Sequence, residues 1–386
     1  MSENQSLGSN YRELVRNAAG FSAEGFEEFV AFAAQYHPSA SNEKAEIVDW
    51  LSAANRQADL VPLEVLLKDW IPYAYHSRTG EVSWCLPQGR AVQPFHDEYI
   101  SHCRQYLVNA LISPRISVDN MLRHADALAE IADPAGFIFH LSRCGSTLVS
   151  GCLAQLEQCS VLSESPLLTE ILLDKNLPEL HKKSLLRLCL QWQGRPSLAQ
   201  PYIIVKWNAW DIFYWPLIRD LYPQVPVLFL TRDPVEILAS HAKSAGRHMS
   251  GEPALGHVHP AFCSQADTGF LQHRIQVLQE IMTRMYELRL EPDVLFLDYM
   301  LLHADKIQAI CRFFDVPLTS SSVELFHKRF ARHSKQPDKI FHNDVREKRG
   351  SLSEDVVREI KVKISDRYQK MLCVSASDAD VSALFK

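Results

Sequence analysis

The chain lacks an excess of positive charge. Its 386 residues include 40 Lys and Arg against 46 Asp and Glu, so the formal net charge is −6. General binders of nucleic acid or of anionic membranes present a broad basic surface, and this balance argues against both classes of partner. Any anion that the protein binds must therefore be held by local groups.

Three further patterns are missing. The nine scattered cysteines contain no C-x-x-C spacing, and no run of about 18 apolar residues occurs in the chain. The polar first ten residues also lack the basic-then-apolar pattern of a signal peptide. These absences predict a cytoplasmic protein with reduced thiols and no membrane span.

The sequence pattern changes near residue 132. Residues 1–131 carry apolar positions mainly at helical spacing, in 26–36, 44–53, 63–70 and 116–131, and one alternating segment, 73–86, predicts a β-hairpin around Arg78-Thr79-Gly80. Residues 132–386 instead alternate short apolar runs with helical stretches. We therefore expect an α/β domain at 132–386, with a parallel sheet flanked by helices, and a mainly helical N-terminal region at 1–131.

The second part allows strands and helices to be assigned. We expect strands at 137–141, 202–205, 225–231 and 294–297, and helices at 147–156, 235–242 and 304–314. In parallel β-α-β units, ligands bind at the carboxyl ends of the strands. Polar residues that directly follow these strands are therefore the candidates for function.

A short polar loop follows the first of these strands. It contains Ser142, Arg143, Cys144, Gly145, Ser146 and Thr147. Backbone N–H groups of such a loop and of the next helical turn converge on one point with partial positive charge, which suits phosphate or sulfate. The glycine lets the backbone approach the anion, while the arginine and the hydroxyls add donors. The alternative is an ordinary strand-to-helix turn.

The loop departs from the nucleotide-triphosphate motif G-x-x-x-x-G-K-S/T. His140 occupies the position of the first glycine, and Ser146 occupies that of the lysine. Without that lysine, and with no obvious aspartate partner for magnesium, ATP hydrolysis loses its two main charge neutralisers. The departure favours a different phosphate-bearing donor.

A second motif follows the strand at 225–231. Arg232-Asp233-Pro234 ends this strand and opens a helix, in which Ser240 lies about two turns further on. Arg232 and Ser240 can meet around one anion. The alternative is a surface arginine and a serine on a helix face.

Together the two motifs resemble the family of sulfotransferases that use 3′-phosphoadenosine 5′-phosphosulfate (PAPS). Residues 142–148 are similar to the family's 5′-phosphosulfate loop, and the segment from Arg232 to Ser240 is similar to its 3′-phosphate motif. Arg349, in Lys348-Arg349-Gly350, faintly resembles a late element that reaches the same phosphate. The resemblance covers about residues 135–370. It implies a fold related to P-loop kinases, PAPS as co-substrate, a small-molecule acceptor and no metal.

The resemblance also implies catalytic roles, which we set beside ordinary structural ones. Arg143 would contact the phosphosulfate together with Ser146 and Thr147. The position of Lys206 at the end of the strand 202–205 instead suggests a second cation on the bridging oxygen, or a solvated strand-end lysine. Glu164 would be the general base, with its pKa raised toward neutrality by a desolvated pocket, unless it caps a helix. His140 is the rival base or a core residue.

Other functions remain open at this point. An atypical P-loop nucleotide or metabolite kinase would share the fold, and a non-catalytic nucleotide-binding protein could keep the anion loop. The N-terminal region could form a wall of the acceptor site or the contact of a homodimer. The segment 244–269 is expected to be a mobile loop over the acceptor site.

Overall fold

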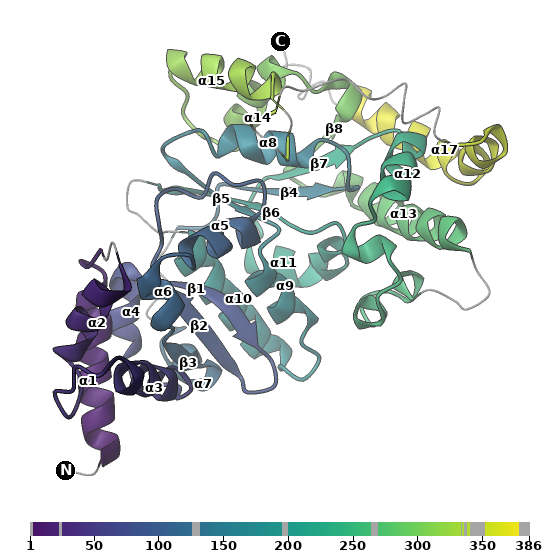
Figure 1. Ribbon diagram of the computed structural model, residues 1–386. Helices are drawn as coiled ribbons and strands as arrows, with labels where there is room; N and C mark the ends of the chain where they lie inside the picture. The colour runs from purple at the N-terminus through teal and green to yellow at the C-terminus, as the bar shows by residue number, and fades with distance from the viewer. Residues whose placement is uncertain are drawn as a thin grey trace. The chain divides into compact units, whose positions relative to one another are not determined.

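The computed structural model describes residues 3–22, 25–125, 132–194, 200–263, 269–332, 334–335, 338–339 and 352–377 (Figure 1). The chain divides into two compact units, one from Met1–Ala132 and Ser165–Gln200, the other from Asp133–Glu164 and Pro201–Lys386. The segment 165–200 thus packs with the first unit, although the sequence analysis placed it in the domain at 132–386.

The first unit combines helices with a small antiparallel sheet. β1 (Ile71–His76) pairs with β2 (Glu81–Cys85), which confirms the predicted hairpin. The predicted helix at 116–131 is wrong at its start, because Ile116 in β3 (Arg115–Ser117) pairs with Val82 of β2 and is fully buried. Residues 126–131 of that helix lie outside the described residues. The helices of the unit are α1 (Glu3–Ala18), α2 (Phe26–Ala34), α3 (Lys44–Asn55), α4 (Leu63–Asp69), α5 (His96–Cys103), α6 (Leu107–Leu111), α7 (Val118–Arg123), α9 (Pro166–Leu173) and α10 (Glu179–Gly194).

The second unit is built on a parallel sheet of five strands in the order β5-β6-β4-β7-β8. The strands are β4 (Gly136–His140), β5 (Cys159–Ser163), β6 (Tyr202–Lys206), β7 (Val227–Thr231) and β8 (Val294–Asp298). The predicted α/β class, a parallel sheet flanked by helices, is therefore confirmed. The sequence analysis had not assigned a strand to residues 159–163.

Helices and short 3-10 turns lie between these strands and after the last one. The helices are α8 (Ser146–Leu153), α11 (Trp215–Leu221), α12 (Pro234–Lys243), α13 (Phe270–Glu287), α14 (Ala304–Phe313), α15 (Ser320–Phe330) and α17 (Glu354–Ser377). The 3-10 turns are η2 (Asp211–Tyr214), η3 (Arg247–Met249), η4 (Pro253–Leu255), η5 (Pro260–Phe262), η6 (Leu288–Leu290) and η7 (Tyr299–Leu301). The expected loop at 244–269 thus contains three 3-10 turns, and residues 264–268 of it lie outside the described part.

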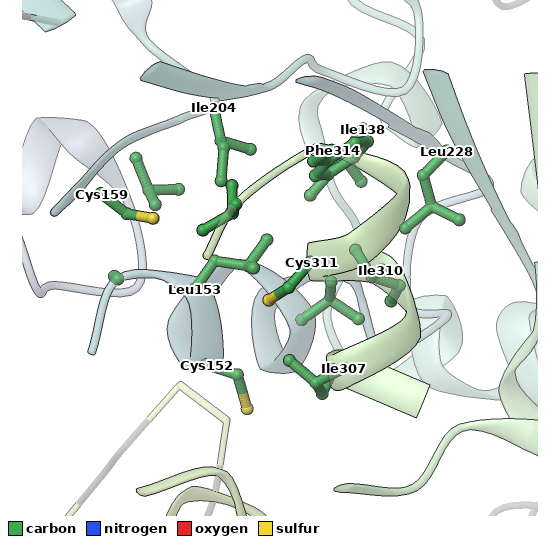
Figure 2. Packing of buried hydrophobic residues seen from close by; sticks show 14 of the residues in the cluster. Ile138, Cys152, Leu153, Cys159, Ile204, Leu228, Ile307, Ile310, Cys311 and Phe314 are labelled. Carbon is green, nitrogen blue, oxygen red and sulfur yellow. The ribbon is translucent and has the colours of Figure 1, made fainter. Parts of the chain in front are cut away.

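The two faces of the sheet carry different side chains. Because successive residues of a strand point to opposite faces, Ile138 and Leu228 share one face, where they pack with Leu153 of α8 and Ile310 of α14 (Figure 2). The neighbouring positions on the other face are aromatic: the rings of Phe137, Phe139, Phe229, Phe296, Trp207 and Trp215 form a continuous set of contacts. Both faces are thus buried, as parallel sheets require.

Gly136 opens β4 under an aromatic ring. A Cβ atom at this position would lie 2.4 Å from Cδ1 of Phe314, which itself is 1% exposed. The glycine therefore allows the end of α14 to pack directly on the first residue of the central strand.

Two expectations about the whole chain can be compared with the structure. None of the helices in the described part is long and apolar enough to cross a membrane. All nine cysteines are free thiols, and only Cys263 and Cys373 are exposed.

Candidate functional site

The polar loop between β4 and α8 has an unusual backbone. Ser142, Arg143 and Gly145 have φ values of 63°, 52° and 86°, in the left-handed region that non-glycine residues rarely adopt. Two hydrogen bonds support this shape: the N–H of Ser142 donates to Nδ1 of His140 over 3.0 Å, and Nη1 of Arg232 donates to the carbonyl oxygen of Arg143 over 3.0 Å. The loop is thus held from both sides.

The start of α8 is suited to an anion. Gly145 is the N-cap residue and offers no side chain to the helix, and the first N–H groups of a helix have no acceptor within it. These groups carry partial positive charge. A Cβ atom on Gly145 would also lie 2.8 Å from Cδ2 of Tyr299, so only glycine fits here without a shift. The loop therefore has the backbone geometry expected of a phosphate or sulfate site.

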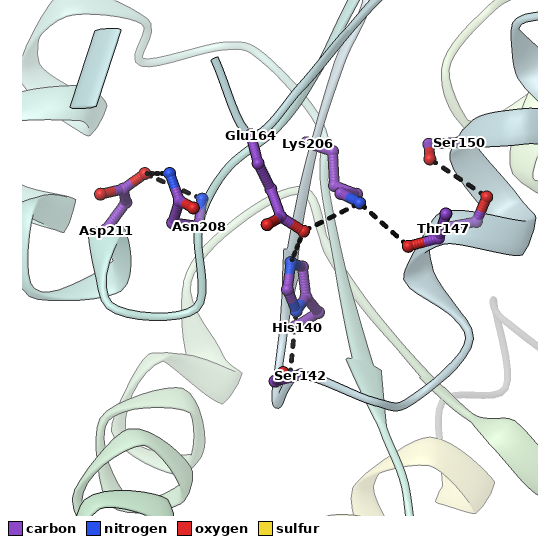
Figure 3. A network of polar contacts seen from close by, with 8 residues as sticks. All are labelled: His140, Ser142, Thr147, Ser150, Glu164, Lys206, Asn208 and Asp211. Atoms are coloured by element: carbon purple, nitrogen blue, oxygen red, sulfur yellow. Dashed lines mark hydrogen bonds and ion pairs between the residues drawn. The ribbon is translucent and has the colours of Figure 1, made fainter. Parts of the chain in front are cut away.

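A network of charged and polar side chains lies beside this loop, at the ends of β5 and β6 (Figure 3). Nζ of Lys206 is 2.9 Å from Oε1 of Glu164 and 3.3 Å from Oγ1 of Thr147, in the first turn of α8. Nε2 of His140 lies 3.3 Å from the same carboxylate oxygen. The Lys206 side chain is completely buried. The structure thus brings four of the predicted site residues into one network, and Lys206 is not a solvated lysine.

The expected raised pKa of Glu164 is wrong. Burial acts to raise the pKa of this carboxyl, but the charge of Lys206 and the contact with His140 outweigh it and hold the pKa well below its usual range. Glu164 is therefore ionised near neutral pH. About a quarter of its side chain is exposed, so it does not lie in the closed pocket that the sequence analysis assumed.

His140 is held as a neutral ring. It is 4% exposed, and burial lowers its pKa despite the opposing effect of Glu164. Because Nδ1 accepts a hydrogen bond from the N–H of Ser142, the ring proton lies on Nε2 and faces Glu164. Neither nitrogen offers a lone pair to a substrate in this arrangement. His140 fits a positioning role between the loop and Glu164 better than that of a base.

Arg232 is engaged within the protein. Its Nε and Nη2 lie 2.8 and 2.7 Å from Oε2 of Glu236, and its guanidinium carbon is 4.1 Å from the centre of the Tyr299 ring. Arg232 as a whole residue is 5% exposed, and Ser240, further along α12, is half-buried. At least three of the five guanidinium N–H groups are used internally, so Arg232 also shapes the loop.

The remaining predicted site residues differ in their burial and in their hydrogen bonds. Arg143 donates from Nη2 to the carbonyl oxygen of Ser244 over 2.6 Å. The side chain of Cys144 is fully buried in the apolar cluster under the sheet, and burial raises its pKa to about 12, so only its backbone can face an anion. Ser146 is also buried. Arg349 lies outside the described residues.

Two further polar residues, Asn208 and Asp211, follow the end of β6 within five positions and were not predicted from the sequence. Oδ2 of Asp211 accepts hydrogen bonds from the backbone N–H and from Nδ2 of Asn208, over 2.8 and 3.2 Å. Burial raises the pKa of Asp211 to about 7, and the charge of Glu164 adds to this effect. Polar residues just beyond the strand end at Lys206 were a usable signal. No group of three metal-ligating side chains occurs among the residues that the structure covers.

Comparisons with known proteins complete the description. No family model matches the chain, and no curated protein matches it in sequence. A sulfotransferase from Alicyclobacillus acidocaldarius is similar in structure with a TM-score of 0.41 and 12% identity, over 66% of this chain and 100% of that one. Sulfotransferase STF9 from Mycobacterium avium is similar with a TM-score of 0.37 and 13% identity, over 64% of this chain and 80% of that one.

Proposed function

We propose that the second unit transfers the sulfuryl group of PAPS to an acceptor hydroxyl or amine and releases adenosine 3′,5′-bisphosphate. The observation that carries the proposal is the position of Lys206. Its buried ammonium group lies 3.3 Å from the Thr147 hydroxyl at the start of the anion-binding helix. The cation that a nucleotide-triphosphate loop carries in its own sequence is here supplied from the end of a neighbouring strand.

The residues fit the two ends of such a donor. The loop 142–147 and the first turn of α8 would hold the 5′-phosphosulfate, with Lys206 and Arg143 as cations. Arg232 and Ser240 would face the 3′-phosphate, for which Arg232 retains N–H groups beyond the three that it uses internally. Sulfuryl transfer develops less negative charge than phosphoryl transfer, so hydrogen-bond donors and one or two cations can suffice without a metal.

Proton transfer is assigned to Glu164. Its ionised carboxylate would accept the proton of the acceptor as the acceptor oxygen or nitrogen forms its bond to sulfur. The bond from sulfur to the phosphate oxygen breaks in the same displacement, and Lys206 would stabilise the charge left on that oxygen. His140 would keep Glu164 in place through its Nε2 proton. This assignment uses the network drawn in Figure 3.

Calorimetry and product analysis test the proposal. Adenosine 3′,5′-bisphosphate should bind the full chain without magnesium and more tightly than ADP does. PAPS with labelled sulfate should then yield a labelled compound from a metabolite extract, together with the bisphosphate. Tighter, magnesium-dependent binding of ATP would point to a kinase. Bisphosphate binding without any release of product from PAPS would point to a non-catalytic nucleotide-binding protein.

A further inference from the structure

Four buried side chains near the proposed site have unsatisfied polar atoms. Trp210, Asp211, His241 and His248 are 5%, 1%, 0% and 4% exposed. Within the described part of the chain, Nε1 of Trp210, Oδ1 of Asp211, and Nε2 of each histidine have no hydrogen-bond partner. Leaving one buried polar group unpaired costs about 1–3 kcal/mol. Four such atoms in one region therefore need hydrogen-bond partners from outside the chain, either water or a ligand.

The four residues form one cluster within the second unit. The ring centres of Trp210 and His248 are 5.6 Å apart, and those of His248 and His241 are 5.5 Å apart at an angle of 87°. Asp211 follows Trp210 directly in the chain and begins η2. We call these four residues the orphan cluster. They come from the turn after β6, the end of α12 and the 3-10 turn η3.

The hydrogen-bonding character of the orphan cluster can be assigned. Nδ1 of His241 accepts a hydrogen bond from the N–H of Gly246 over 3.2 Å, so the proton of the neutral ring lies on Nε2, which is a donor. The indole nitrogen of Trp210 is a donor only. Oδ1 of Asp211 is the free oxygen, because Oδ2 already accepts from Asn208. The cluster thus offers at least two N–H donors and one carboxyl oxygen.

Both imidazoles are uncharged near neutral pH. Burial lowers the pKa of His241 to about 2 and that of His248 to about 3. The positive charges of Arg143, Arg274 and Lys335 lower the pKa of His241 further. A ligand of this cluster would therefore contact two neutral imidazoles, and not two positively charged ones.

The orphan cluster lies within electrostatic reach of the proposed catalytic network. The carboxylate of Glu164 acts on both Asp211 and His248 and raises the pKa of each. Figure 3 shows Asp211 and Asn208 on the same side of the network as Glu164. Arg143 of the polar loop donates to the carbonyl oxygen of Ser244, and Gly246 in the same segment donates to Nδ1 of His241. Asn208, which donates to Asp211, follows Lys206 by two positions. The orphan cluster therefore adjoins the residues that would hold the phosphosulfate.

We propose that the orphan cluster binds the acceptor, and that this acceptor is an uncharged compound with two neighbouring oxygen substituents, at least one of them a hydroxyl. The hydroxyl donates to Oδ1 of Asp211, and the N–H groups of Trp210 and His241 donate to the acceptor's oxygens. The buried indole and imidazoles of the cluster supply no counter-ion, so burying a charged acceptor group against them would be costly. The inference rests on the proposed function, since it names the class of acceptor for that reaction.

Direct binding tests this inference separately from catalysis. The probes are two uncharged vicinal diols, methyl α-glucoside and catechol, and two charged sugars, glucosamine and glucuronic acid. Calorimetry with the full chain, with and without adenosine 3′,5′-bisphosphate, should show binding of a diol and no binding of either charged sugar. Trp210→Phe and His241→Phe, which remove one donor each, should weaken diol binding by about tenfold.

A matched control is available in the first unit. His96 is 2% exposed, and neither of its ring nitrogens has a partner among the described residues. His96→Phe should leave diol binding unchanged. Circular dichroism verifies that each variant is folded, and Asp211→Asn, which keeps the size of the side chain, replaces any variant that is not.

The outcomes separate the two proposals. Failure of both diols to bind, equal binding of the charged sugars, or unchanged diol binding in the folded cluster variants overturns the acceptor site. If the bisphosphate does not bind but diol binding still depends on Trp210 and His241, the acceptor site stands and the sulfuryl-transfer function fails.

Discussion

Lys206 and Glu164 form a 2.9 Å ion pair at the ends of the neighbouring strands β6 and β5. The N–H of Glu164 donates to the carbonyl oxygen of Lys206 over 2.7 Å, and Glu164 has a φ of 53°. This left-handed residue ends the strand pairing and brings its carboxylate back toward the lysine. A completely buried ammonium group is costly without such a partner. The charge of Lys206 thus keeps Glu164 ionised.

Glu164→Gln should reduce turnover roughly tenfold or more, because the proton acceptor is removed while the loop remains. Affinity for adenosine 3′,5′-bisphosphate, measured by calorimetry, should stay within about twofold of the wild type, since the change is uncharged and of the same size. Equal turnover of variant and wild type would remove Glu164 from the mechanism.

Lys206→Met should have a larger effect on transfer, about a hundredfold, because the cation on the departing oxygen is lost. The variant also leaves the Glu164 carboxylate without its main partner, so its pKa should rise and the protein should lose stability. Lys206→Met combined with Glu164→Gln is the control, and it should recover stability in urea unfolding but not turnover. Recovery of turnover in the double variant would contradict a catalytic role for the lysine.

The raised pKa of Asp211 predicts a pH dependence of stability. The folded protein binds the Asp211 proton up to a pH of about 7, whereas the unfolded chain releases it near the ordinary aspartate pKa of 3.8. The free energy of unfolding should therefore fall as the pH rises through this window. Glu164 strengthens the shift, and Arg247 opposes it.

The variant Asp211→Asn isolates this contribution. Its stability relative to the wild type should increase steadily between pH 4 and pH 7, because only the wild type acquires the buried charge. Urea unfolding of both proteins at several pH values gives this difference directly. Parallel stability curves would show that the carboxyl titrates near its ordinary pKa.

Gly145→Ala tests the close packing of the loop. The positive φ costs an alanine about 1 kcal/mol, and overpacking against Tyr299 costs about 1–3 kcal/mol more. Gly89→Ala is a matched control, because Gly89 has a φ of +63° and open space around its Cβ position. Gly145→Ala should be clearly less stable than Gly89→Ala and should also weaken bisphosphate binding. Equal losses of stability in the two variants would show that Tyr299 gives way freely.

Gly136→Ala tests the contact between β4 and α14. The new methyl group would overlap the ring of Phe314, and such overpacking costs about 1–3 kcal/mol. Phe314→Leu in the same chain makes room, so the double variant should lose less stability than the sum of the two single variants. Additive losses in urea unfolding would argue against direct contact.

Much of the second unit could be predicted from local sequence. The strand ends at His140 and Lys206 and the helix after Gly145 depend on apolar runs and on turn chemistry, which are visible in short windows. Residue Ile116 shows the limit in the first unit. The apolar spacing around Ile116 predicts a helix, but this residue pairs in a sheet with Val82, more than 30 residues earlier in the chain.

The chemistry of the site was harder to predict than its position. The pKa of Glu164 depends on Lys206 and His140, which come from two other strands, so burial alone gave the wrong direction. Tyr299 and Glu236 also contact Arg232 only in the folded chain. Asp211 could have been found earlier, because it follows a strand end within five residues.

The hydrogen bond from Arg232 to the carbonyl of Arg143 joins segments that are 89 positions apart. Ser142 and Arg143 adopt left-handed conformations that an isolated peptide would seldom populate. A synthetic fragment covering only β4 and α8 would lack the hydrogen bond from Arg232. The backbone of its loop would therefore adopt other conformations. The proposed affinity for an anion would therefore be a property of the completed sheet, because it needs β7 in place beside β4.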